Sequence, residues 1–210
     1  MRKAITILII VSLALSLVAC SNSKEKNEIR GEIIYLRSYE CKVGYIVQFG
    51  PYLWRILDIK DDNVLLISEE ILTSRPFYSN PSSGNKTWAD SELRKWLNRE
   101  FLDVFSDEEI SRIINTRVIN SEDPSGDDDT KDKIFLLSVD EVTKYFSTNK
   151  ERRARYKELE NLTEWYAWMT RTVSLIDTYV CQVDLAGKVN SNTLGISGGG
   201  VRPAMWLKIK

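Results

Sequence analysis

Segments rich in β-branched and aromatic residues alternate with turn residues in the part of the chain that follows its apolar N-terminus. Three such segments are residues 45–49, 52–59 and 64–68, and residues of these types favour strands. Gly50-Pro51 and Asp61-Asp62-Asn63 separate the segments, and both are typical turn sequences. The pattern predicts a meander of antiparallel hairpins.

A helical period replaces this alternation after residue 90. Apolar residues at positions 93, 96, 97 and 101 share one face of a helix, because an α-helix repeats about every 3.6 residues. Asp90 or Ser91 can cap this helix, which we expect to extend to about Phe105. Two further helices are predicted at capping boxes of the form Ser-x-x-Glu, Ser106–Glu109 and Ser138–Glu141.

Strand-forming segments return toward the end of the sequence, at residues 134–137, 165–171, 179–183 and 201–209. A densely charged stretch among them, residues 149–161, is expected to be a solvated helix or loop. No repeat or linker divides residues 33–210, so the pattern predicts one α+β domain. We expect its first and last strands to share a sheet.

The first twenty residues have the features of an export signal. Arg2 and Lys3 precede a mostly apolar run over residues 4–19, which is shorter than the roughly 20 residues that cross a bilayer. Leu17-Val18-Ala19-Cys20 resembles the lipobox of bacterial lipoproteins, in which the cysteine receives a diacylglycerol and becomes the first mature residue. An ordinary signal peptide or a short anchor helix is the alternative.

A lipoprotein signal implies a location and a membrane partner. Residues 1–19 would be removed, Cys20 would be acylated, and the polar residues 20–32 would form a flexible tether. Two or more acyl chains give a stable anchor, so we expect a protein held on the cell membrane and facing away from the cytoplasm. In that compartment Cys41 and Cys181 either form a disulfide or are two buried, small apolar side chains.

The composition excludes several classes of chemistry. The 210 residues contain no histidine, which rules out Ser-His-Asp catalysis, Cys-His catalysis and histidine-ligated zinc within this chain. A Gly-x-Ser-x-Gly pattern at residues 195–199 therefore lacks the base that a hydrolase nucleophile elbow needs, and glycines 198–200 are expected to allow positive φ or close approach. A net charge of −1 provides no basic field for nucleic acid.

Short motifs follow one another between residues 47 and 207: Val47-Gln-Phe-Gly50, Trp54-Arg-Ile-Leu57, Leu65-Leu-Ile-Ser68, Thr87-Trp88, Leu93-Arg-Lys-Trp-Leu-Asn98, Asp132-Lys-Ile-Phe-Leu-Leu-Ser138 and Val201-Arg-Pro-Ala-Met-Trp-Leu207. Their order resembles a family of bacterial domains of unknown function found in surface and exported proteins. That family is similar to the C-type-lectin-like fold shared with formylglycine-generating enzymes, which implies antiparallel sheets with a few short helices. Those enzymes use two cysteines close together in sequence, and this chain has no such pair, so the resemblance implies the scaffold alone.

Five residues are candidates for a ligand groove: Trp88, Tyr166, Trp168, Arg171 and Arg202. Aromatic rings can stack on sugars or anchor a protein partner, and arginines can line the same surface. The alternative is that the rings lie in the core and the arginines pair with carboxylates.

An acidic loop is a candidate calcium site through Asp127, Asp129 and Asp132. Calcium binds six to eight oxygens, which carboxylates and carbonyls supply. The spacing differs from that of an EF-hand loop, and most acidic loops are only solvated. No other cofactor is indicated.

These observations favour a non-catalytic, lipid-anchored surface domain that binds a glycan or a protein. One rival is a hydrolase of envelope polymers that uses carboxylates alone, as glycosidases do, and Glu69, Glu70, Asp90 and Glu92 are available for it. The other rival is a structural accessory subunit of an envelope complex.

Overall fold

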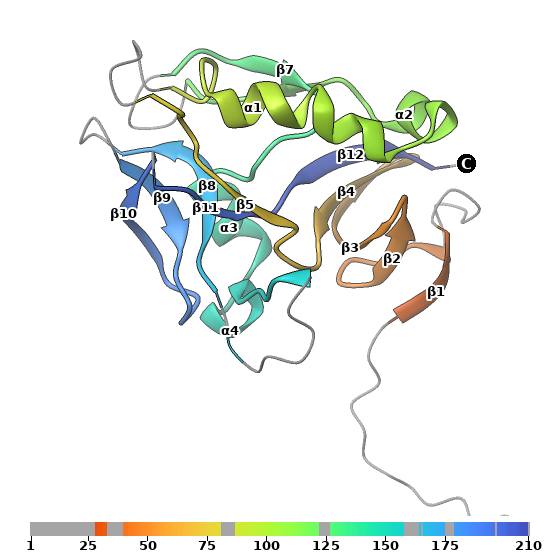
Figure 1. Cartoon of the computed structure of the whole chain (residues 1–210). Helices are drawn as coiled ribbons and strands as arrows, with labels where there is room; N and C mark the ends of the chain where they lie inside the picture. The colour runs from red at the N-terminus through yellow and green to blue at the C-terminus, as the bar shows by residue number, and fades with distance from the viewer. Residues whose placement is uncertain are drawn as a thin grey trace, which may run out of the picture.

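Two five-stranded sheets and several short helices make up the computed structural model (Figure 1). The structure describes residues 28–32, 40–80, 87–121, 127–157, 164, 166–174, 179–195 and 197–209. The predicted lipidation site Cys20 and the predicted signal peptide lie outside the described residues. Within the described ranges, no helix is long and apolar enough to span a membrane. The α+β class is confirmed.

The first sheet has the strand order β1-β2-β3-β4-β12. Its strands are β1 (Glu28–Glu32), β2 (Ile46–Phe49), β3 (Tyr52–Lys60), β4 (Asn63–Ser68) and β12 (Ala204–Lys208). β1 is parallel to β2, and the other neighbours are antiparallel. The predicted meander is confirmed. The sheet shared by early and late strands is confirmed as well, because β12 pairs with β4.

The second sheet has the order β10-β9-β8-β11-β5. Its strands are β5 (Thr73–Arg75), β8 (Trp168–Val173), β9 (Tyr179–Val183), β10 (Val189–Leu194) and β11 (Gly199–Val201). β8 is parallel to β11, and the other neighbours are antiparallel. A third, two-stranded sheet consists of β6 (Thr116–Val118) and β7 (Thr130–Asp132). β8 is central in the second sheet and is buried along its whole length.

The helices are short and begin at polar caps. They are α1 (Glu92–Leu97), the 3-10 helix η3 (Glu100–Val104), α2 (Asp107–Arg112), α3 (Val139–Tyr145) and α4 (Asn149–Arg152). Ser91 caps α1, but the helix predicted to reach Phe105 is divided into α1 and η3. Both predicted capping boxes are confirmed, at α2 and α3. A third, formed by Thr148 and Glu151, begins α4.

Two chain segments pass from one sheet to the other side by side. β4 leads into β5 and β11 leads into β12, and β4 pairs with β12 while β5 pairs with β11. Between these pairs, the Ser68 N–H donates to the Pro203 carbonyl (2.9 Å), and the Leu72 N–H donates to the Val201 carbonyl (2.9 Å). Hydrogen bonding therefore continues across the bend. We call residues 63–75 and 199–208 the bent ribbon.

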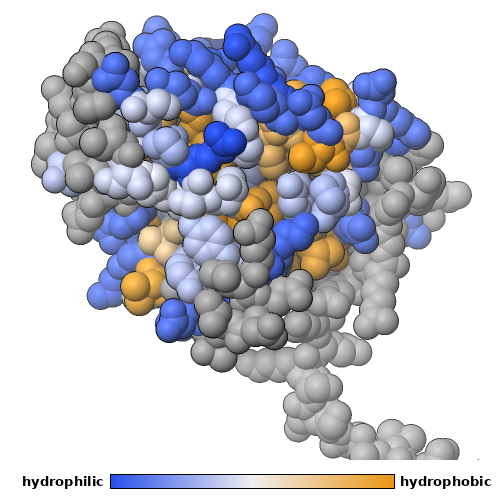
Figure 2. All heavy atoms as spheres, viewed as in Figure 1, coloured by the Kyte–Doolittle hydropathy of each residue, from blue (hydrophilic) through white to orange (hydrophobic). Residues whose placement is uncertain are grey.

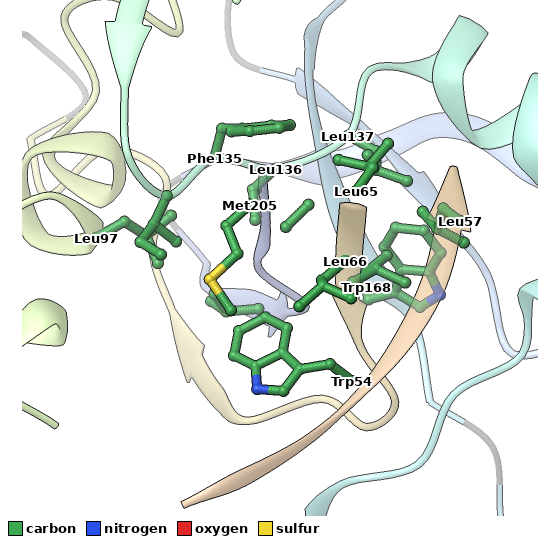
Figure 3. Packing of buried hydrophobic residues seen from close by; sticks show 14 of the residues in the cluster. Trp54, Leu57, Leu65, Leu66, Leu97, Phe135, Leu136, Leu137, Trp168 and Met205 are labelled. Carbon is green, nitrogen blue, oxygen red and sulfur yellow. The ribbon is translucent and has the colours of Figure 1, made fainter. Parts of the chain in front are cut away.

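A single apolar cluster fills the space around this ribbon. Leu66 and Met205 are register partners across β4 and β12, and both lie close to Trp54 (Figure 3). Trp168 of the second sheet and Leu57 of β3 belong to the same cluster. Burying one large apolar side chain contributes about 1.5–3 kcal/mol, so this shared core is a major source of stability for both sheets.

Three further predicted elements differ from the structure. Residues 134–137 are not a strand: all four side chains are buried, but Phe135 makes only an isolated bridge to β12. Residues 28–32, predicted as flexible tether, form β1 against β2. The strand predicted over 201–209 is interrupted at Arg202-Pro203, because proline has no N–H for a ladder and the chain changes sheets there.

Candidate functional site

A pocket lies where α3 and α4 approach β3 and the bent ribbon. Its volume is about 420 Å³, which is within the usual range for small-molecule sites. Positive residues outnumber negative ones in the lining, since four are Arg or Lys and two are Glu. The lining residues are Val43, Gly44, Arg55, Ile56, Leu57, Glu69, Tyr145, Phe146, Lys150, Glu151, Arg153 and Arg202.

Arg202 contributes a buried cation to this pocket, and its side chain comes from the bend of the ribbon. Its Nε donates to the Ser68 carbonyl (2.8 Å) and its Nη2 to the Glu69 carbonyl (3.3 Å). The guanidinium lies 5.4 Å from the Phe146 ring centroid and 5.2 Å from that of Trp168. Nη1 has no hydrogen-bond partner among the described residues. Burial lowers the pKa of Arg202 to about 10, so the residue is cationic at neutral pH.

Both acidic residues of the pocket already have partners. Arg55 donates from Nε to Glu69 Oε2 (2.8 Å) and also pairs with Glu69 through Nη2. Glu151 Oε2 accepts from the backbone N–H groups of Ser147 (2.9 Å) and Thr148 (3.3 Å), which completes the capping box of α4. Among the described residues, neither carboxylate forms an ion pair with the Arg202 guanidinium, although the charge of Glu69 raises the pKa of Arg202 and so partly offsets the effect of burial.

The rest of the lining gives the pocket an apolar wall and a charged outer edge. Ile56, Leu57 and Phe146 are buried. Val43 is 61% exposed, and Lys150 is also exposed, so both lie toward solvent. The arrangement suits a ligand that has an apolar part and a polar or negative group.

Residues 61–209 match a family model described as "Domain of unknown function (DUF6273)". The chain belongs to this family. The DUF6273 match includes Glu69, Arg202 and the pocket residues of α3 and α4, whereas the lining residues before position 61 precede it. No curated protein and no solved structure matches the chain.

Four of the five predicted groove residues are buried in the DUF6273 domain, and three of these four do not line the pocket. Trp88 and Trp168 are fully buried, and Arg171 is 2% exposed. Trp88 Nε1 donates to Asp132 Oδ2 (3.0 Å), and Trp168 Nε1 donates to the Arg152 carbonyl (2.8 Å). The prediction that these residues line a surface groove is therefore wrong, because their side chains are enclosed and their polar atoms are bonded inside the protein.

Arg171 joins several segments of the domain. Its Nε donates to Asn120 Oδ1 (2.8 Å), its Nη1 to the Leu136 carbonyl (2.9 Å) and its Nη2 to the Ile119 carbonyl (2.9 Å). Nη1 also forms an ion pair with Glu141 of α3. These contacts give Arg171 a structural role.

The other two predicted groove residues have different surroundings. Tyr166 is half-buried, and its ring packs edge-on against Tyr156 with centroids 5.1 Å apart. Arg202 lines the pocket, and Trp168 packs against it from the interior. The structure thus brings Trp168 and Arg202 together.

Asp129, one of the three calcium candidates, is occupied by protein donors. Its Oδ1 accepts from the backbone N–H groups of Asn120 (3.0 Å) and Ser121 (3.2 Å), and its Oδ2 accepts from Arg117 Nη2 (2.7 Å). The two backbone hydrogen bonds, with help from Arg117, hold the pKa of Asp129 well below its usual range. This carboxylate closes the turn that follows β6.

Asp127 and Asp132 are also bonded to protein groups. Asp132 is 1% exposed, and its Oδ1 accepts from Arg94 Nε (2.7 Å). Asp127 accepts from the Ala89 N–H (3.3 Å), and burial raises the pKa of Asp127. In the part of the chain that the structure describes, no three acidic or cysteine side chains gather as a metal site.

Neither Cys41 nor Cys181 forms a disulfide in the structure. Cys41 is buried just before β2, whereas Cys181 is in β9 of the other sheet. The disulfide considered from the sequence is therefore not formed. Burial raises the pKa of the Cys41 thiol.

The carboxylates considered for hydrolysis do not meet in the pocket. Glu69 lines it, whereas Glu70, Asp90 and Glu92 do not. Glu92 instead accepts from the Ser79 N–H (3.1 Å) at the start of α1.

Sequence reasoning missed the pocket residues on β3 and α4. Arg55 and Glu69 meet because β3 and β4 are antiparallel neighbours, and no spacing rule singles out that pair. The Thr148–Glu151 capping box has the same form as the two that were found, so this signal could have located α4 and Lys150.

Proposed function

We propose that this chain is a lipoprotein held on the outer side of the cell membrane. Its DUF6273 domain binds an envelope glycan, or a protein of which a small part enters the pocket, and does not chemically change the ligand. The lipobox-like sequence ending at Cys20 supports the anchor. The pocket beside Arg202 supports binding. The motif order supports a lectin-like scaffold for the α+β domain.

The main support for the binding proposal is the Arg202 guanidinium, which has an unsatisfied donor. Nη1 of Arg202 is buried and has no hydrogen-bond partner in the described parts of the chain. A buried donor without a partner costs about 1–3 kcal/mol, and more if it is charged, so folded proteins satisfy nearly all such groups. A ligand that supplies an acceptor in the pocket would remove this cost.

Two further observations favour binding of a small ligand. A glycosidase needs two carboxylates placed on either side of the scissile bond, but Glu69 and Glu151 are occupied by Arg55 and by backbone N–H groups. On the face shown in Figure 2, hydrophobic residues form separate areas, with hydrophilic residues over α1. A large apolar protein interface would need a continuous patch.

A binding screen with a matched pair of variants tests the pocket. The mature chain, produced without lipid as Cys20→Ser, is screened against glycans and cell-wall fragments. Val43→Trp places a large ring at the outer edge of the pocket, whereas Leu185→Trp adds the same ring at an equally exposed site (61% and 65%) that does not line it. We expect Val43→Trp to abolish binding and Leu185→Trp to preserve it. Equal binding by the two variants, or no ligand in the screen, would contradict the proposal.

The anchor has an independent test in cells. The wild-type protein should fractionate with membranes and be accessible to added protease, and Cys20→Ser should not acquire lipid. Unprocessed wild-type chain in the cytoplasm would refute this part of the proposal without affecting the pocket.

A further inference from the structure

The pocket has a positive electrostatic bias that its own acidic residues do not remove. Glu69 is paired with Arg55, and Glu151 is held by the N–H groups of its capping box. Arg202 has no ion pair with a carboxylate among the described residues. Lys150 adds a second positive charge at the exposed side of the same pocket.

Arg202 is fixed in one orientation by the bent ribbon. Carbonyls of Ser68 and Glu69 accept from Nε and Nη2, and the rings of Phe146 and Trp168 pack against the guanidinium. A guanidinium held in this way loses little freedom when it binds a ligand. Of its three nitrogens, Nη1 is the one without an acceptor in the described part of the chain.

We infer that the ligand is anchored by an oxyanion, a carboxylate or a phosphate, which accepts from Nη1 of Arg202 while Lys150 attracts its charge. This inference rests on the proposed binding function of the pocket. A neutral hydroxyl could also accept from Nη1. However, hydrogen bonds between ionised partners are about twice as strong as neutral ones, and they gain further from an environment of low dielectric constant.

The apolar part of the lining limits what else the ligand contains. Ile56, Leu57 and Phe146 provide a wall beside the charged groups, so an inorganic anion alone would leave most of the pocket unfilled. The expected ligand is a small organic acid or phosphate with a ring or an aliphatic portion, such as an acidic sugar at the end of a glycan.

Calorimetric titration of the mature Cys20→Ser chain with matched probes tests this inference. The probes are methyl glucoside, methyl glucuronide, glucose 6-phosphate and inorganic phosphate. The first two differ only at C6, which is a hydroxymethyl group in the glucoside and a carboxylate in the glucuronide. The last two compare a sugar phosphate with the free ion. We expect at least one acidic sugar to bind about tenfold or more tightly than methyl glucoside and than inorganic phosphate.

Charge variants connect the result to the pocket. Lys150→Glu should weaken binding of the acidic sugar about fivefold, since it reverses a charge at the pocket edge. Lys131→Glu makes the same change on an exposed lysine of β7 and should leave affinity unchanged. Arg202→Met should abolish binding of the acidic sugar. If Arg202→Met does not fold, the comparison of Lys150→Glu with Lys131→Glu still tests the inference.

The outcomes separate the inference from the proposed function. Equal affinity for methyl glucoside and methyl glucuronide, with no effect of Lys150→Glu, would overturn the oxyanion inference but leave a binding pocket. Failure of every probe would also overturn it, and the wider Val43→Trp screen would then decide whether the pocket binds a ligand of another class.

Discussion

Arg171→Met would measure how far one buried arginine holds the domain together. Methionine retains much of the apolar volume, but it removes the positive charge and all the donors of the side chain. Those donors serve Asn120 Oδ1, the carbonyls of Leu136 and Ile119, and the Glu141 carboxylate. The substitution therefore leaves acceptors in several segments without their donor.

The expected loss of stability follows from burial. The Arg171 side chain is 2% exposed and that of Glu141 is 31% exposed, so water can partly replace the lost partner of Glu141 but cannot reach the others as easily. Leaving a buried polar group unpaired costs about 1–3 kcal/mol, and breaking a buried ion pair costs about 3–5 kcal/mol. Because the carbonyls can relax toward other donors, we expect a total of about 3–5 kcal/mol, a large part of the roughly 5–15 kcal/mol of a typical domain.

Urea unfolding of Arg171→Met beside Arg117→Met provides the assay. Arg117 also pairs with an aspartate, Asp129, but its side chain is 71% exposed, and exposed ion pairs contribute less than about 1 kcal/mol. The free energy of unfolding should therefore fall much further in Arg171→Met than in Arg117→Met. Equal losses would refute the argument that burial makes the Arg171 network important.

Two further changes test local features. Backbone N–H groups of Asn120 and Ser121 depress the pKa of Asp129, so its stabilising charge is fully present above the unfolded pKa of about 3.9 and is lost as pH falls through the lower folded pKa. The melting temperature of Asp129→Asn should thus be below that of wild type at pH 7, and a gap that does not narrow below about pH 4 would contradict this. A Cβ at Gly200 would lie 2.5 Å from the Ala167 backbone oxygen, whereas one at Gly199 meets the side chain of Met169. Gly200→Ala should therefore lower the melting temperature more than Gly199→Ala, and the reverse order would count against a backbone clash.

Local features of the fold could be predicted from the sequence. Capping boxes at Ser106 and Ser138 depend on residues three positions apart, and the structure confirms both. The meander was also predictable, because turn residues separate its strands. The strand predicted from the apolar run at 134–137 was wrong, since a segment buried on all sides has the same composition whether or not it pairs in a sheet.

The candidate site could not be predicted in the same way. Its lining comes from separate segments between residues 43 and 202, which only the sheet pairings bring together. Trp168 was predicted to line a ligand groove, but it lies in a central strand that is buried along its whole length. Arg202 was predicted to be a ligand-binding residue, but the absence of a partner for Nη1 among the described residues depends on the folded surroundings and leaves no mark in the sequence.

The bent ribbon also determines whether parts of the domain can unfold independently. Its two segments lie more than a hundred positions apart in sequence, and they carry the ladder of one sheet into the ladder of the other. A cut anywhere between the two segments would separate β4 from β12 and β5 from β11, so neither half would keep a complete five-stranded sheet. When denaturant unfolds one sheet, the other sheet loses the hydrogen bonds that continue into it through the bent ribbon. We therefore expect the domain to unfold in a single cooperative step.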